Sequence, residues 1–234
     1  MSTAGDVSTS EASESTGSVC PDFVTCGDTF FQCGDGRDND GDGLFDLDDP
    51  ECVSACDDDE ADFGLFLPGD SCTCLVDCYF DGNSGSGDDD CHDDVNCDPL
   101  EPGWCGCEFE PGPGCTEVEQ SPECLAFCEP FVPNGCDCFG CCTFATPDGP
   151  VNLFLEIPGC SLANLDACPA CTQQIEECGN PCEVDACEIC IGQTEPAKGC
   201  AAPACVGGRA CGSHCDCEPG EACITGCCVP PTPG

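Results

Sequence analysis

Residues 124–142 read CLAFCEPFVPNGCDCFGCC and place six cysteines within nineteen positions. The whole chain of 234 residues contains 34 cysteines, whereas Leu, Ile, Val and Phe together make up less than a fifth of it. So few apolar residues cannot build an ordinary core. Up to 34/2 = 17 disulfides, which close short loops, would replace that core. The sequence therefore predicts a small disulfide-rich, mostly irregular fold with short helices, a few short β-strands and little conventional hydrophobic core.

The charge of the chain restricts its partners. It contains 47 acidic and 3 basic residues, for a formal net charge of −44. Phosphate backbones and anionic lipid surfaces repel such a protein, so we expect no nucleic-acid partner and no electrostatic membrane binding. No stretch approaches the roughly 20 apolar residues of a transmembrane helix. Cations remain as the ligands that this charge favours.

The cysteines also indicate a compartment, because disulfides form in oxidising surroundings. Residues 1–20 show neither the basic start nor the apolar centre of a signal peptide. We therefore expect an export signal or a lipid anchor upstream of Met1, and a flexible Ser/Thr-rich tether over residues 1–19. The predicted location is extracellular or the cell surface, with a bacterial outer surface suspected. The alternative is a cytoplasmic metal-thiolate protein.

Two Pro/Gly-rich stretches, 110–114 and 192–199, divide the rest of the chain into three expected modules. These are an acidic Cys-rich module (20–109), a second Cys-rich module (110–194) and a C-terminal knot-like module (195–234). They contain 12, 14 and 8 cysteines, so each could pair internally.

Regular structure should be sparse. Apolar residues alternate along 151–157, which predicts a strand. Asp49 before Pro50 and Ser121 before Pro122 each resemble the start of a short helix, with an N-cap followed by proline at the first helical position. A third short helix is expected over 166–178.

The strongest motif lies in residues 33–52, CGDGRDNDGDGLFDLDDPEC. Positions 1, 3, 5, 6, 9 and 12 of a calcium-binding loop are occupied by Asp38, Asp40, Asp42, Gly43, Asp46 and Asp49. Calcium needs six to eight oxygen ligands, and a loop that wraps it presents alternate side chains inward. Gly43 permits the sharp turn, Leu44 would supply its backbone carbonyl, and Asp46 would bind directly or through water. The predicted calcium ligands are therefore Asp38, Asp40, Asp42, Leu44, Asp46 and Asp49.

This motif resembles the calcium repeats of thrombospondin type 3 and dockerin modules. Its fuller form, DGxDNDGDGxxDxxDPxC, is similar to a metal-binding motif of Cys-rich bacterial surface or secreted proteins, which are often lipid-anchored. The resemblance covers about 20 of the 234 residues. Position 12 is Asp49 rather than the usual Glu, so Asp48 could take its place, and Gly34 and Gly36 preclude a stable entering helix. Cys33 and Cys52 flank the loop and could clamp its ends.

The calcium loop is the first acidic cluster of the chain, and a second spans 57–62. A third, 81–94, begins with Asp81 and Asn83 at ligand spacing but has Gly85 and Ser86 at the next positions, so a solvated loop is favoured there over a second cation site.

Cysteine pairs with one or two intervening residues recur along the chain and would also suit zinc. The adjacent pairs Cys141-Cys142 and Cys227-Cys228 and the irregular spacings favour disulfides instead. His92 and His214, the only histidines, would be needed for a copper site.

Catalytic motifs are lacking: the sequence has neither a nucleophile elbow nor a Gly-rich phosphate loop. One Trp and one Tyr, Trp104 and Tyr79, cannot line a sugar-binding cleft. We therefore expect a non-catalytic, exported, calcium-binding surface, matrix or binding protein whose partner is an extracellular protein or polysaccharide. The alternatives are a metal-handling protein, as a cation buffer or a zinc or copper binder, and a protease-inhibitor or toxin-like module.

Overall fold

The computed structural model describes residues 29–64, 74–81, 90–100, 106–110, 112, 115, 119–205, 208–213, 216–218 and 221–229. The tether expected over 1–19 lies outside this part of the chain. Regular elements are short, and the expected disulfide-rich, mostly irregular fold is confirmed. The strands are β1 (Leu75–Val76), β2 (Asp93–Asp94), β3 (Cys136–Asp137), β4 (Cys141–Thr146), β5 (Gly149–Phe154), β6 (Gly179–Asn180), β7 (Ala222–Ile224) and β8 (Cys227–Val229). The helices are α1 (Pro122–Cys128) and the 3₁₀ turns η1 (Gln32–Gly34), η2 (Asp46–Asp48), η3 (Tyr79–Asp81), η4 (Val95–Cys97), η6 (Glu129–Phe131), η7 (Leu162–Ala167) and η8 (Val184–Ala186).

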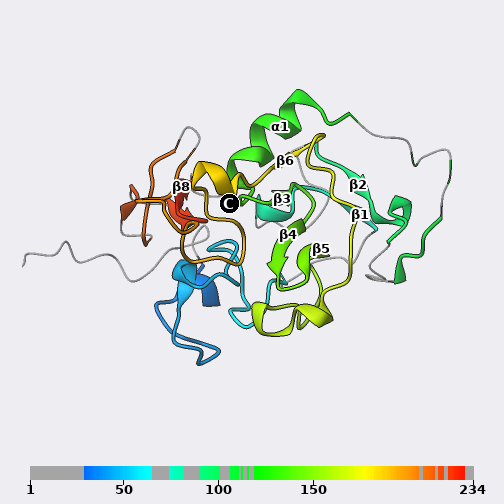
Figure 1. Cartoon of the computed structure of the whole chain (residues 1–234). Coiled ribbons are helices and arrows are strands. Elements are labelled where there is room, and N and C mark those ends of the chain that lie inside the picture. The colour runs from blue at the N-terminus through cyan, green and yellow to red at the C-terminus, as the bar shows by residue number, and fades with distance from the viewer. Residues whose placement is uncertain are drawn as a thin grey trace, which may run out of the picture.

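A four-stranded antiparallel sheet in the order β5-β4-β3-β6 occupies the centre (Figure 1). Gly149 ends the tight turn between β4 and β5 with φ = 123°, a conformation that glycine adopts without strain. The strand expected over 151–157 is confirmed as far as Phe154. It is wrong for the last three residues, because the N–H of Leu155 bonds to Gly140 and the chain then turns toward Cys160.

The helix expected from Pro122 is confirmed as α1. The side chain of Ser121 accepts the N–H of Cys124 at 2.9 Å, which caps the helix as its sequence predicts. The helix is only seven residues long, so packing and covalent bonds must stabilise it. Disulfides do so near both ends, at Cys124 and Cys128.

The other two expected helices are wrong. Pro50 lies in a turn in which the N–H of Cys52 donates to the carbonyl of Asp49, and Cys52 is drawn back to Cys33 by a disulfide. Over 166–178 the chain is extended or turned, apart from the end of η7. Three disulfides join this segment to three different places, Cys160, Cys141 and Cys138, and so hold it away from helical geometry.

Fourteen disulfides join cysteines of the described residues, and none of the cysteines there is free. The cysteines do not all form disulfides within their own expected module. Four bridges cross the expected boundaries at 110 and 195, and they are Cys78–Cys128, Cys91–Cys124, Cys97–Cys115 and Cys187–Cys200. The three-part division itself stays a prediction.

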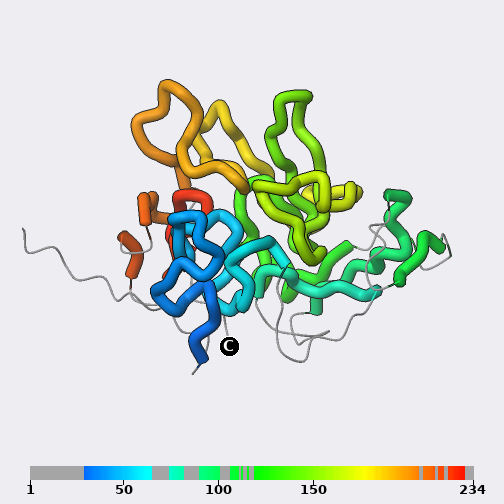
Figure 2. The backbone as a smooth tube through the Cα atoms, turned by 90° about the horizontal axis from the view of Figure 1, so that it is seen from below, coloured from blue at the N-terminus to red at the C-terminus, as the bar shows by residue number. Residues whose placement is uncertain are grey.

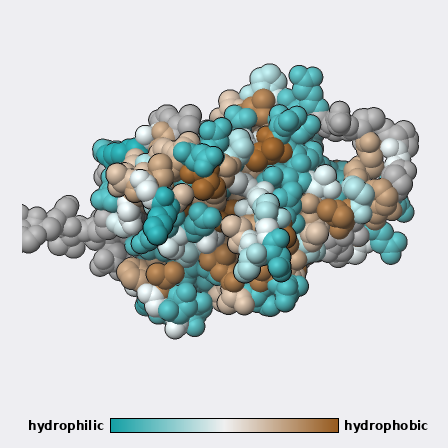
Figure 3. All heavy atoms as spheres, in the orientation of Figure 1, coloured by the Kyte–Doolittle hydropathy of each residue, from teal (hydrophilic) through white to brown (hydrophobic). Residues whose placement is uncertain are grey.

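The largest buried cluster extends from Val53 to Ile191, and about half of its members are half-cystines. Phe63, Phe80, Phe144 and Leu155 are its largest fully buried apolar side chains, and the rings of Phe63 and Phe144 pack 5.4 Å apart. Cystine sulfur thus supplies the buried volume that aliphatic residues supply elsewhere. Hydrophilic residues alternate with hydrophobic ones over the face shown in Figure 3. Among the described residues, no helix is long and apolar enough to cross a membrane.

A smaller cluster joins the two ends of the described chain. It contains Cys33, Leu47 and Cys52 from the acidic loop and Ala222 from β7, with Ile224 packed against them. Figure 2 shows the N-terminal segment beside the C-terminal hairpin β7–β8. The second half of the predicted calcium loop therefore rests on the fold, whereas its first half faces solvent.

Candidate metal centre

The acidic loop is closed at its base by a covalent clamp. Cys33 and Cys52 form a disulfide with their Cα atoms 5.5 Å apart, as the sequence suggested. Within residues 29–37, the described part of the chain before the loop, the helical structure is limited to the three-residue turn η1, so no entering helix forms there, as expected. The disulfide limits the conformations open to the loop between its ends, and this lowers the entropy lost when the loop wraps an ion.

The first half of the loop gathers three carboxylates. Asp38, Asp40 and Asp42 are exposed, and each offers an oxygen within 4.8 Å of an oxygen of the other two. Backbone amides orient them: Asp38 accepts the N–H groups of Gly41 at 2.6 Å and Gly43 at 3.2 Å, and Asp40 accepts that of Asp42 at 3.0 Å. Gly43 has φ = 102°, which fits the sharp turn expected at position 6 of a calcium loop.

Leu44 and Asp46 lie beyond this turn. The N–H of Leu44 donates to Asp42 at 2.7 Å, and its side chain is exposed. Asp46 is buried, and both of its carboxylate oxygens accept the N–H of Gly36 at 3.0 Å. Asp46 also has φ = 51°, a left-handed conformation in which Asp is one of the few tolerated residues.

Asp49, at position 12, is buried, with 2% of its surface exposed. One carboxylate oxygen accepts the N–H of Glu51 at 2.9 Å, whereas the other, Oδ2, has no hydrogen-bond partner. Burial, followed by the neighbouring carboxylates of Glu51 and Asp42, raises the pKa of Asp49 to about 7, although the Glu51 N–H acts in the opposite direction. A buried carboxylate oxygen without a partner is costly. The structure does not bring Asp46 or Asp49 into the group of carboxylates that Asp38, Asp40 and Asp42 form.

Glu60 is a residue of this site that the loop spacing did not reveal. It belongs to the second acidic cluster, yet its carboxylate accepts the N–H of Asn39 on one oxygen and the N–H of Asp46 on the other, each at 2.5 Å. The pKa of Glu60 is raised, chiefly by burial. The two N–H groups lower it, and the charges of Asp49 and Asp46 contribute further to the increase. Its place in an acidic cluster was the only sequence signal.

The ion pairs of the described residues join Arg37 to Asp35, and Arg209 to Glu218 and Glu221, all outside the six predicted ligands. The loop combines exposed and buried carboxylates, all of them oxygen donors. Hard divalent cations prefer such a donor set, and calcium accepts its irregular geometry more readily than magnesium does.

The second acidic cluster is largely internal rather than solvated. Asp57 is fully buried, its Oδ2 has no hydrogen-bond partner, and burial raises its pKa well above the ordinary value. Asp62 accepts the N–H groups of Gly64 at 2.9 Å and Gly159 at 2.6 Å, which ties this segment to the loop before Cys160. The centre of the third cluster, residues 82–89, lies outside the described residues.

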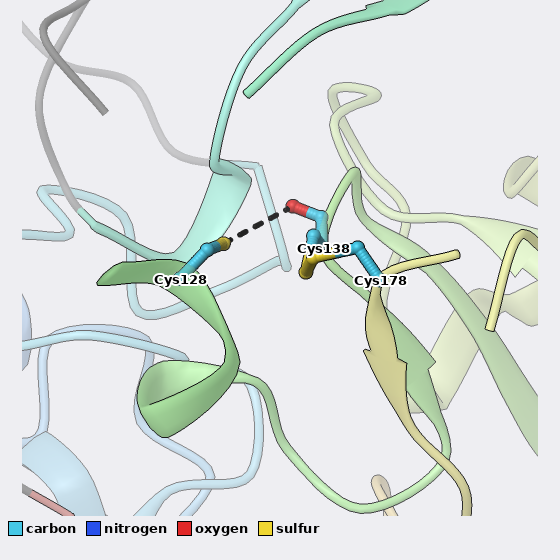
Figure 4. Close-up of side chains that lie close together, drawn as sticks. All are labelled: Cys128, Cys138 and Cys178. Carbon is cyan, nitrogen blue, oxygen red and sulfur yellow. Dashed lines mark hydrogen bonds between the residues drawn. A yellow bond between two sulfur atoms is a disulfide. The ribbon is translucent and has the colours of Figure 1, made fainter. Parts of the chain in front are cut away.

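Three sulfur atoms form a group that could be mistaken for a thiolate metal site. The Sγ atoms of Cys128, Cys138 and Cys178 lie within 4.8 Å of one another, and Cys128 Sγ lies 3.9 Å from the carbonyl oxygen of Cys138 (Figure 4). Each of these sulfurs is in a disulfide, Cys78–Cys128 or Cys138–Cys178, and so is not a thiolate. This arrangement does not favour zinc.

Of the remaining candidate residues, the structure describes His92 and Tyr79. His92 is exposed, and only its backbone bonds, to the side chain of Gln120. His214 and Trp104 lie outside the described residues, so the copper alternative stays a prediction. Tyr79 is buried and donates its hydroxyl to the carbonyl of Phe63, which gives it a structural role.

No family model, no curated protein and no solved structure matches the chain. The loop must therefore be judged on its own residues and geometry. The disulfide framework indicates a secreted or extracellular Cys-rich protein.

Proposed function

We propose that this chain is an exported, non-catalytic protein whose loop 38–49 binds one calcium ion. The observation that carries the proposal is the buried Asp49, whose Oδ2 has no hydrogen-bond partner. The charge of Asp42, in the exposed carboxylate group, contributes to its raised pKa. A single cation held by this loop would satisfy that oxygen and relieve the repulsion among the surrounding acids.

The ligand roles follow from the loop spacing, and the positions of three side chains support them. Asp38, Asp40 and Asp42, whose oxygens lie together, would supply carboxylate oxygens, and Leu44 would supply its backbone carbonyl. Because both oxygens of Asp46 already accept the N–H of Gly36, this residue would act through water more readily than directly. Asp49 would supply the oxygen at position 12. Calcium contributes positive charge, and the chain contributes a turn already shaped by its own hydrogen bonds.

The biological role we propose is that of a surface or matrix component, in which calcium fixes one edge of a disulfide framework for contact with an extracellular protein or polysaccharide. Leu44 and Phe45, within the loop, expose 37% and 43% of their surface, so ordering the loop also orders apolar groups that such a partner could touch. A location on a bacterial outer surface with a lipid anchor belongs to this proposal and rests on the resemblance of the motif.

Calorimetric titration tests the proposal. The intact protein should bind one calcium ion with Kd on the order of 10⁻⁴–10⁻³ M, the range of extracellular modules. Asp42→Asn should weaken binding by about tenfold or more, because it removes a ligand oxygen and its charge. Asp148→Asn, at an exposed turn outside the loop, is the matched control and should leave Kd unchanged. Absence of binding at 10 mM calcium would reject the proposal.

A further inference from the structure

The hydrogen bonds of Glu60 connect the two halves of the acidic loop from outside it. We infer that Glu60 is a positioning residue, which holds the calcium ligands in place without itself binding the ion. The inference rests on the proposed function and deepens it, because it assigns the control of calcium affinity to a residue eleven positions beyond the end of the loop at Asp49.

The geometry of the contact is that of a two-point staple. Glu60 Oε2 accepts the N–H of Asn39, and Oε1 accepts the N–H of Asp46, each at 2.5 Å. Asn39 stands between the ligands Asp38 and Asp40, and Asp46 occupies position 9. One carboxylate therefore fixes the distance between the backbone of the first half of the loop and that of the second. Hydrogen bonds to a charged acceptor are about twice as strong as neutral ones.

Glu60 is itself held by the framework. Its side chain is fully buried. On one side of it, the carbonyl of Asp57 accepts the N–H of Cys33 at 3.1 Å, and on the other, Phe63 donates its N–H to Cys160 at 2.8 Å. The two hydrogen bonds of Glu60 thus attach the loop, whose first half is exposed, to the disulfide-bonded core.

The position of Glu60 separates it from the ligands. Both of its oxygens accept backbone amides of the loop, whereas the ligand oxygen proposed for position 12, Asp49 Oδ2, accepts nothing. Residues that orient metal ligands from behind typically change metal affinity by ten- to a hundredfold when they are removed. A purely structural residue would change stability and leave the affinity for calcium unaltered.

Glu60→Gln tests the inference, because Gln keeps the shape but has one acceptor oxygen and no charge. Calorimetry on the full disulfide-bonded chain should show a ten- to a hundredfold rise in Kd for calcium. Asp62→Asn is the matched control: it removes one charge from a buried carboxylate that also accepts two backbone N–H groups, Gly64 and Gly159, but does not touch the loop. Its Kd should stay within twofold of the wild-type value.

A second measurement needs no variant and no calcium. In the calcium-free wild-type protein, the amide protons of Asn39 and Asp46 should exchange with solvent at least tenfold more slowly than that of Asp40. Equal exchange rates would overturn the staple, and a wild-type Kd in Glu60→Gln would overturn its effect on affinity. If wild type binds no calcium while both amides are protected, the proposed function fails and the positioning role with it, and Glu60 is then a structural anchor.

Discussion

Asp49→Asn should stabilise the calcium-free protein at pH 8 and lose part of that advantage when calcium is present. In the calcium-free protein the carboxyl is buried and its pKa is about 7, against the ordinary value of 3.8. A carboxyl whose pKa is higher in the folded state favours folding at low pH, and that contribution is lost as the pH rises from about 4 to about 7. At pH 8 the ionised side chain therefore destabilises the fold.

The magnitude follows from the two opposing effects of the substitution. A shift of about three pKa units corresponds to about 4 kcal/mol. The amide that replaces the carboxylate is also buried without a full set of partners, which costs about 1–3 kcal/mol. Asp49→Asn should therefore stabilise the calcium-free protein by about 1–3 kcal/mol at pH 8. At pH 4 the folded carboxyl is already protonated, so the cost of the buried amide dominates and the variant should be the less stable protein, by at most about 3 kcal/mol.

Calcium should reduce the advantage of the variant over the wild type. With Kd of about 10⁻⁴–10⁻³ M, 10 mM calcium stabilises the wild type by RT ln(1 + [Ca]/Kd), or about 1.4–2.7 kcal/mol. In the variant an amide NH2 group replaces Oδ2, so it should gain less than about a third of that stabilisation. Calcium should therefore reduce the advantage of the variant at pH 8 by about 1–2 kcal/mol.

Guanidinium unfolding with the disulfides intact, followed by near-UV circular dichroism at pH 4 and pH 8, measures both effects. Asp148→Asn carries the same chemical change at an exposed site and should stay within about 0.5 kcal/mol of wild type throughout. The reasoning is refuted if calcium stabilises wild type and Asp49→Asn equally, or if the calcium-free variant is the less stable protein at pH 8.

Two other predictions concern the framework. Leu155→Ala should cost about 2–5 kcal/mol of unfolding free energy because this side chain is fully buried. Val151→Ala in β5, where the residue is 38% exposed, should cost less than about 1 kcal/mol, and equal losses in denaturant titrations would contradict the packing described. Burial raises the pKa of Asp137 to about 7, so this group favours folding below about pH 4 and loses that contribution toward pH 7. Asp137→Asn should therefore flatten the decline in stability between those pH values, by at most about 4 kcal/mol, and an unchanged slope would rule out this group as its source.

Local features were predictable where the sequence itself contains the whole interaction. Ser121 caps α1 because the cap and its amide partner are three residues apart, and the Cys33–Cys52 clamp joins residues that flank one motif. The expected helix at Pro50 does not form because a disulfide draws Cys52 away from it. Propensity is weak against a covalent bond, so helix signals in this chain hold only where the disulfides allow them.

The missed residue of the metal centre has a different cause. Glu60 contacts the loop 21 residues away at Asn39 and 14 residues away at Asp46, and no periodicity encodes such contacts. Within an acidic run, a stapling carboxylate and a solvated one have the same sequence signal. What distinguishes them is burial, which depends on how the segment after Cys56 packs.

Disulfides allow a chain with a net charge of −44 to bury carboxylates. Each disulfide stabilises the folded state by about 2–4 kcal/mol, mainly by restricting the unfolded chain, and this contribution does not depend on what the core contains. It can offset buried acids such as Asp57 and Asp137, which an ordinary core of this size could not tolerate. In the loop, however, a disulfide at the base cannot remove the repulsion between Asp42 and Asp49, because a covalent bond carries no charge. A cation can reduce that repulsion. The disulfides therefore hold the chain together, and the proposed calcium ion would allow its acidic groups to approach one another.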